Sequence, residues 1–248
     1  MADKIRVTFW HEFRHEKRNE YVSKLYPGGI HAVVCGFLNE ESDIEATFVS
    51  LDDPEQGLTD ELLENTDVLL WWGHLAHGEV KDDLVEKIAY RVMAKGMGFI
   101  PLHSGHKSKP FQRIVGSTGN LSWGDNQREI IWNINPAHPI AAGIPDHFLI
   151  ESEEMYGEPF YIPQPDELVF ASCYENGNIF RSGLCYNRGA GKVFYFQPGH
   201  ETCKSFYDPN VRKIIVNAVR WAKPADFGFE QNIDCTHITS SIKDEFNK

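Results

Sequence analysis

Four histidines stand where runs of strand-forming residues end. In an open parallel sheet the carboxyl ends of the strands meet at one edge, and ligands bind there. Neutral imidazole is a preferred ligand of zinc, and three histidines with one open position make up a catalytic zinc site. The spacing therefore predicts a divalent-metal site, with zinc as the expected ion. The candidate ligands are His11, His74, His103 and His200.

The stretch around His103 has the pattern of a nucleophile elbow. An apolar run over residues 97–102 ends abruptly in His103-Ser104-Gly105-His106. A buried strand that enters a tight turn before a helix holds the side chain of that turn above the sheet edge. A histidine at this position cannot act as an ordinary acyl nucleophile, but it can bind a metal or transfer protons. His103 and His106 are therefore catalytic candidates, the second as a proton donor.

Glutamates accompany these histidines along the chain. Glu12 and Glu201 each follow a strand-end histidine directly, and Glu153 and Glu154 are adjacent in a later segment with apolar or tight flanks. Each of the four is a candidate fourth ligand, orienting residue or general base. For the base that removes a proton next to a carbonyl, we favour Glu154 or Glu201.

Aromatic residues near the predicted loops are candidates for sugar binding, because an aromatic ring packs well on the apolar face of a sugar. Burial in the core is the competing interpretation, and it is the better one for Trp71. The substrate-binding candidates are Trp10, Trp72, Trp123 and Tyr156.

A histidine taken singly is more often a surface residue or a hydrogen-bonded core residue than a ligand. Four of the remaining histidines are interpreted in that structural sense, and two more as residues at the rim of the site. The structural set is His31, His138, His147 and His237, and the rim set is His15 and His77.

Strands and helices alternate through residue 115, which predicts a doubly wound parallel sheet. Apolar residues four apart give the clearest helix, over 79–95, and Asn176-Gly177 marks a hairpin turn. The expected strands are 4–10, 44–51, 67–72, 97–102, 128–133, 167–174, 179–186 and 192–197, and the expected helices are 29–38, 58–63, 79–95, 109–115 and 210–222.

The composition limits the possible partners and compartment. A net charge of −12 disfavours nucleic acid and anionic membranes. The sequence has no apolar run of bilayer length and no signal-peptide layout at its start. Five cysteines without a CxxC pair fit reduced thiols. We therefore expect a cytoplasmic protein with a small-molecule substrate. Residues 1–222 would form a single domain, and the polar tail 223–248 hints at a homo-oligomer.

Several motifs in series resemble the ThuA-like trehalose-utilisation family. They are "DVLLWWGH", "GFIPLHSGH", "NPAHPIAAGIP", "SEEMYGEPF" and "GAGKVFYFQPGHE", in that order, and the resemblance covers residues 3 to 222. It implies a flavodoxin-like three-layer sandwich similar to class I glutamine amidotransferases. It also implies a role in sugar catabolism.

The difference from the amidotransferases is informative. Their elbow carries a cysteine before a Gly-His pair, where this chain has His103, while His200-Glu201 echoes their catalytic His-Pro-Glu. Without the thiol, glutaminase chemistry through a thioester is not expected.

The leading hypothesis is a metal-dependent enzyme that isomerises, eliminates from or hydrolyses an oxidised trehalose-type disaccharide. The alternative is a non-catalytic sugar-binding or regulatory module on an amidotransferase-like scaffold. A zinc hydrolase for another small molecule is a third possibility. The cluster of titratable residues favours an enzyme, since a plain sugar pocket seldom needs so many.

Overall fold

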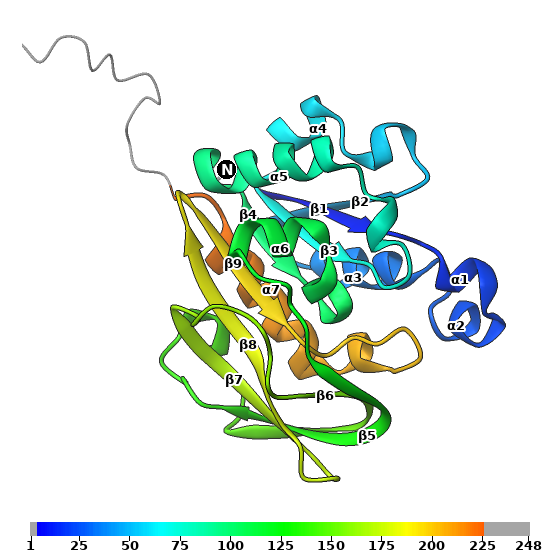
Figure 1. Ribbon diagram of the computed structural model, residues 1–248, viewed down its shortest axis with the longest axis vertical. Coiled ribbons are helices and arrows are strands. Elements are labelled where there is room, and N and C mark those ends of the chain that lie inside the picture. Colours follow the sequence, from blue (N-terminus) through cyan, green and yellow to red (C-terminus); the bar gives the residue numbers. More distant parts are fainter. Residues whose placement is uncertain (1–3, 226–248) are drawn as a thin grey trace, which may run out of the picture.

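Short apolar segments pair in parallel and form one half of a nine-stranded sheet (Figure 1). The computed structural model describes residues 4–225. The strand order is β2-β1-β3-β4-β9-β8-β7-β5-β6. Each pair of neighbours from β2 to β9 in this order is parallel, and each pair from β9 to β6 is antiparallel. The strands are β1 (Ile5–His11), β2 (Ile44–Ser50), β3 (Val68–Trp72), β4 (Gly98–Pro101), β5 (Ser122–Asn133), β6 (His147–Gly157), β7 (Glu167–Tyr174), β8 (Ile179–Arg188) and β9 (Gly191–Phe196).

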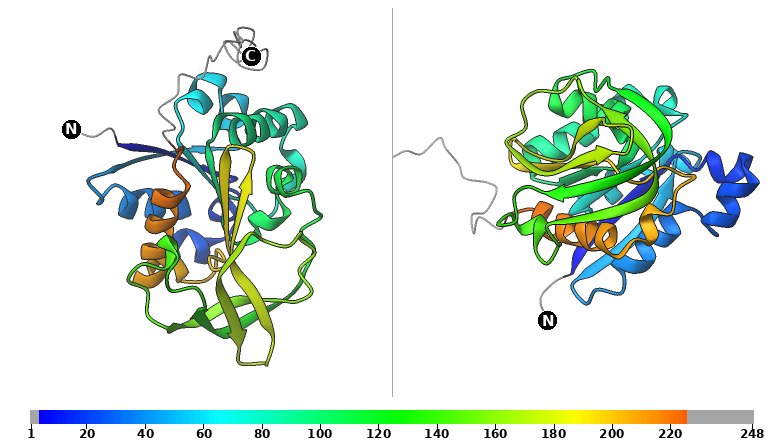
Figure 2. Two further views of the ribbon diagram at one scale, coloured as in Figure 1. Left: turned by 90° about the vertical axis from the view of Figure 1, so that its left-hand side faces the viewer. Right: turned by 90° about the horizontal axis from the view of Figure 1, so that it is seen from below.

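Helices cover both faces of the parallel half, which gives three layers. In Figure 2 (left), α7 (Pro209–Ala222, orange) and α5 (Asp82–Lys95, green) lie on opposite sides of the sheet. Successive strand residues point to opposite faces, so Leu70 packs in the cluster with α7 and Trp71 in the cluster with α5. The predicted doubly wound sandwich is confirmed. The remaining α-helices are α3 (Ile30–Leu38), beside α7, and α4 (Asp60–Glu64) and α6 (Lys109–Val115), beside α5.

Two short helices that the sequence pattern did not predict follow β1. They are α1 (His15–Arg18) and α2 (Glu20–Leu25), and they project beyond the carboxyl end of β1 (Figure 1). Neither is long enough to show a helical period, so no pattern was available to detect them. Their position carries His15 back to the edge of the sheet.

The antiparallel half is larger than expected, because β6 is a strand that the sequence pattern did not predict and β5 begins at Ser122 rather than at Arg128. Its partner β6 brings adjacent glutamates to the end of β9. The amide of Gln197 donates to the carbonyl oxygen of Glu154 at 2.9 Å. The antiparallel strands therefore complete the site at the carboxyl edge of the parallel ones.

The predicted tail falls almost entirely outside the described residues, as does His237. Within residues 4–225, no helix combines the length and the apolar character needed to cross a bilayer.

Candidate active site

His103 occupies a tight turn directly after β4. Its φ is 48°, in the left-handed region that side chains other than glycine rarely adopt. The turn is closed by the N–H of Gly105, which donates to the carbonyl oxygen of Leu102 at 2.8 Å. Strained backbone of this kind persists where the surrounding structure holds it, often at functional sites. The geometry is that of the elbow that the sequence predicted.

The ring of His103 is fixed at both nitrogens. Nδ1 lies 2.8 Å from the carbonyl oxygen of Gln197, so it carries a proton. Nε2 lies 2.9 Å from Oε2 of Glu154 and 3.1 Å from the hydroxyl of Tyr156. Burial alone would lower the pKa of His103, but the hydrogen bond and charge of Glu154 outweigh burial and raise the pKa to about 9. Burial acts to raise the pKa of Glu154, and its contact with His103 outweighs this and lowers the pKa to about 2.

One group of converging ligand atoms lies at this elbow. Atoms of His103, Glu154 and His200 all fall within 4.8 Å of one another, and all three residues are buried or nearly so. His200 Nδ1 pairs with the hydroxyl of Thr202 at 2.8 Å, and Nε2 lies 3.9 Å from Oε1 of Glu154. Each histidine therefore presents Nε2 to Glu154, while its other nitrogen is held by a second contact, as in many metal sites.

A second group adjoins the first. Glu201 lies 3.2 Å from Nδ1 of His15 and 3.2 Å from Nδ1 of His74, and these three residues also bring their ligand atoms within 4.8 Å of one another. His200 Nε2 is 3.3 Å from Oε2 of Glu201, so the two groups are continuous. Burial favours a higher pKa for Glu201, but the hydrogen bond from His74 and the charges of His200 and His15 lower it to about 2.

Two further buried glutamates hold the loops that carry these residues. Glu12 accepts the backbone N–H groups of His74, Leu75 and Ala76 at 2.7, 2.8 and 2.9 Å. Glu153 accepts the backbone N–H groups of the loop after β9. Both side chains are fully buried, and both face the loops, outside either group of ligand atoms.

A cavity of about 530 Å³ is lined by Glu154 and His200 of the first group and by His74 of the second. This volume lies within the range of small-molecule sites and can hold a disaccharide. His106 lines it; burial lowers the pKa of His106 to about 3, and Nδ1 pairs with the carbonyl oxygen of Gly119 at 2.7 Å. The ring is therefore neutral, with Nε2 as its acceptor. Trp123, which is 64% exposed, and Tyr156 also line the cavity.

Three of the sequence candidates lie away from this cavity. His11 is fully buried, its Nδ1 lies 3.1 Å from Nδ1 of His31, and it belongs to neither group. Trp10 stacks on Trp71 with ring centroids 3.7 Å apart. Trp72 is also buried and donates its indole N–H to the carbonyl oxygen of Gly199 at 2.9 Å. Their side chains point into the two cores rather than over the sheet edge.

His15 takes the place that the sequence suggested for His11. The sequence predicts a rim residue at His15, whereas the structure places it in a group of ligand atoms. Its position four residues beyond the end of β1 was the only signal, because the fold of α1 decides which way it faces. His77 lines the cavity, as a rim residue would.

The pair of His103 and Glu154 predicts a pH dependence for the metal-free protein. The raised pKa of His103 stabilises the folded state fully below its ordinary value of 6.5, and this contribution is lost as the pH rises towards 9. We expect the free energy of unfolding to fall by roughly 1–3 kcal/mol between pH 6 and pH 9. Urea denaturation of the chelator-treated protein would measure it. A His103→Asn variant should lack this fall, and an equal fall in both proteins would contradict the assignment.

Comparisons with known proteins agree with this architecture. The chain matches a ThuA-like protein from Parabacteroides merdae with a TM-score of 0.70 and 13% identity, over 89% of this chain and 90% of that one. It matches a cytoplasmic protein from Salmonella typhimurium with a TM-score of 0.56 and 13% identity, over 78% of this chain and 87% of that one. It also matches a glutamine amidotransferase from Thermotoga maritima with a TM-score of 0.52 and 11% identity, over 88% of this chain and 97% of that one. A search of curated proteins found no match.

The fold is that of the class I glutamine amidotransferase-like proteins, a flavodoxin-like sandwich. Within that class, the sequence profile of ThuA, described as trehalose utilisation, matches residues 6–222. The chain therefore belongs to the ThuA family, and the resemblance noted from its motifs is confirmed. Membership supports a role in sugar metabolism.

Proposed function

We propose that this protein is a metal-dependent enzyme that acts on an oxidised trehalose-type disaccharide. The observation that carries the proposal is the convergence of His103, Glu154 and His200 beneath a cavity of disaccharide size. A divalent ion, with zinc as the expected one, would be held by these three residues. When bound, such an ion polarises a carbonyl and its neighbouring hydroxyl.

The electrostatics of the carboxylates fit ligands better than bases. A metal ligand must be deprotonated, and the lowered pKa values of Glu154 and Glu201 keep them so, whereas the ion would have to displace the proton from Nε2 of His103, whose pKa is raised to about 9. A general base works best when its pKa lies near the operating pH. The lowered pKa values therefore favour a ligand role over the general-base role that the sequence suggests for these two glutamates.

The neutral imidazole of His106 lines the same cavity and is a further candidate for proton transfer, but its lowered pKa of about 3 lies well below neutral pH, as do those of the two glutamates. Its Nδ1–H is committed to the carbonyl oxygen of Gly119, so Nε2 first accepts a proton and then returns it. The phenol of Tyr156 lies 3.1 Å from Nε2 of His103 and lines the same cavity, where it orients the reacting sugar. Isomerisation, elimination and hydrolysis of a keto-sugar could each proceed with a divalent ion, a proton-transferring imidazole and an orienting phenol.

Glutaminase chemistry is not part of this proposal. His103 fills the elbow position where an amidotransferase has its thiol. Burial raises the pKa of Cys203 and Cys185 far above the ordinary value, so neither is a ready thiolate.

We also propose that the protein acts in the cytoplasm. Cys35, Cys173, Cys185 and Cys203 are all free, as is typical of a reducing compartment. The fold relative from Salmonella that carries the description "cytoplasmic" adds weak support.

The test is turnover of oxidised disaccharides by metal-stripped and zinc-reloaded protein. We expect product only after reloading, and product analysis by mass spectrometry and NMR would separate isomerisation, elimination and hydrolysis. Full turnover by thoroughly stripped protein would overturn the metal dependence. Calorimetric binding of the sugar without any product would instead support a non-catalytic sugar-binding module.

Trp123 provides a separate test of where the sugar lies. Its exposed ring lines the cavity, and stacking on an aromatic ring contributes about 0.5–1.5 kcal/mol beyond burial. We expect Trp123→Ala to raise KM about 3- to 10-fold while kcat changes little. Trp132→Ala, which removes an exposed ring outside the cavity lining, is the matched control. Equal kinetics in the two variants would place the sugar elsewhere.

A further inference from the structure

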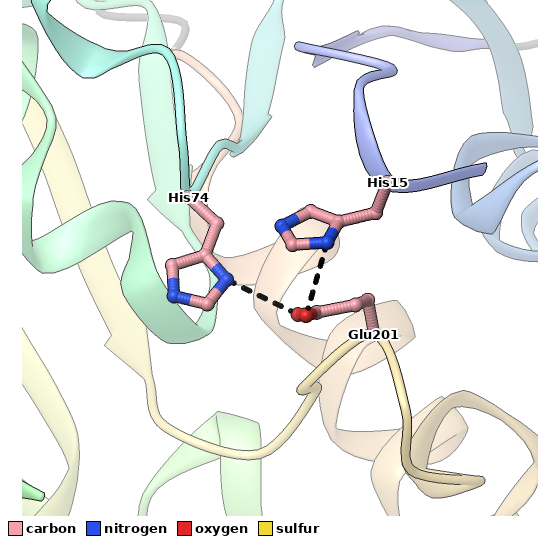
Figure 3. Close-up of side chains that lie close together, drawn as sticks. All are labelled: His15, His74 and Glu201. Carbon is pink, nitrogen blue, oxygen red and sulfur yellow. Dashed lines mark hydrogen bonds and ion pairs between the residues drawn. The ribbon is translucent and has the colours of Figure 1, made fainter. Parts of the chain in front are cut away.

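The geometry points to a second divalent cation, bound by His15, His74 and Glu201 beside the proposed first one. The inference rests on the proposed function and deepens it, because the site becomes a two-metal centre. Figure 3 shows the carboxylate of Glu201 beside both imidazoles, with a ring nitrogen of each facing it. The three residues come from α1, from the loop after β3 and from the loop after β9, so only folding brings them together.

The distances within this group suit a bound ion. A tetrahedral zinc ion with bonds of about 2.0–2.1 Å holds its ligand atoms about 3.3 Å apart. Nδ1 of His15 lies 3.2 Å from Oε1 of Glu201, and Nδ1 of His74 lies 3.2 Å from Oε2, so the two imidazoles face different oxygens of one carboxylate. Charge-assisted hydrogen bonds are shorter, about 2.7–2.9 Å. Both separations are longer than strong hydrogen bonds and close to the edge of a coordination tetrahedron, and the ligand atoms of the three residues lie within 4.8 Å of one another, which fits an ion held between the two imidazoles and the carboxylate.

The ligands are also held in place and remain accessible. The imidazoles of His15 and His74 stack nearly parallel, with ring centroids 5.1 Å apart. The loop of His74 is fixed by the three hydrogen bonds to Glu12. The side chain of His74 is 29% exposed and lines the cavity, which leaves an open side for a substrate oxygen.

The two groups adjoin each other, and members of both line the cavity. His200 Nε2 lies 3.3 Å from Oε2 of Glu201 and 3.9 Å from Oε1 of Glu154, so it stands between the two carboxylates. Two-metal sites place their ions about 3.5–4 Å apart and clamp two oxygens of a substrate. The ligand class that fits is a sugar with neighbouring oxygens, such as a carbonyl beside a hydroxyl.

The experiment is a count of zinc bound per chain, by equilibrium dialysis of the metal-stripped full-length protein and elemental analysis. We expect two equivalents for the wild type. His15→Ala and His74→Ala should each retain one, and His147→Ala, which removes an exposed histidine outside both groups, should retain two. Circular dichroism would establish which variants are folded, and His15→Gln replaces any His15→Ala protein that is not.

The outcomes separate the two proposals. One equivalent in the wild type that is lost in His103→Ala but kept in His15→Ala and His74→Ala overturns the second site and leaves the proposed function standing. No bound zinc overturns both. Two equivalents in folded His15 and His74 variants place the second ion elsewhere and overturn this assignment.

Discussion

Replacing His103 with alanine should abolish zinc binding at the elbow and lower turnover by about 10³-fold or more. Nε2 of His103 is a ligand atom of the first group, and the contact at 2.9 Å also orients Glu154. Removing the imidazole therefore takes away one ligand and frees another. Elemental analysis and the turnover assay on oxidised disaccharides would measure both losses in the same preparation.

His147→Ala is the matched control for that experiment. His147 is exposed on β6 and packs against Trp132, away from the cavity. We expect this variant to keep wild-type zinc content and turnover. Wild-type turnover in a folded His103→Ala protein would remove the elbow from the mechanism.

Replacing Glu153 with alanine should lower the free energy of unfolding by about 3 kcal/mol or more. The fully buried carboxylate accepts the N–H groups of Glu154, Gly199 and His200 at 2.9, 2.9 and 3.1 Å, and it also pairs with the hydroxyl of Ser205. Each buried donor left without a partner costs about 1–3 kcal/mol, and water can restore only part of this. Urea denaturation would measure the difference.

Glu151→Ala controls for loss of a glutamate on the same strand. Its side chain is 75% exposed and pairs only at the surface, with Arg128. We expect a change of no more than about 1 kcal/mol, as is usual for an exposed ion pair. If Glu153→Ala were as stable as Glu151→Ala, then Glu153 would not hold the loop of His200.

The sequence was sufficient to predict the parallel half of the sheet and the elbow. Continuous apolar runs such as Val68–Trp72 mark strands that are covered on both faces. The helices predicted between these strands are the crossover connections that parallel strands need. The abrupt end of the apolar run at His103 predicts a turn there, and the φ of 48° at His103 agrees with it. These features are local, so the local pattern reveals them.

The composition of the site was only partly predictable, because it depends on which way a residue faces near a strand end. His11 is the last residue of β1 and points into the core, whereas His15 returns to the edge on the short helix α1. Trp10 and Trp72 also border loops, but the alternation along each strand turns their rings inward. The role of Glu153 could not be seen either, since its partners lie far along the chain.

Anomalous diffraction at the zinc edge, on crystals of the zinc-reloaded protein, tests the central claim most directly. The account predicts a peak within about 2.0–2.2 Å of Nε2 of His103, Nε2 of His200 and a carboxylate oxygen of Glu154. A direct hydrogen bond between His103 and Glu154, with no peak beside them in crystals that contain zinc, would contradict it.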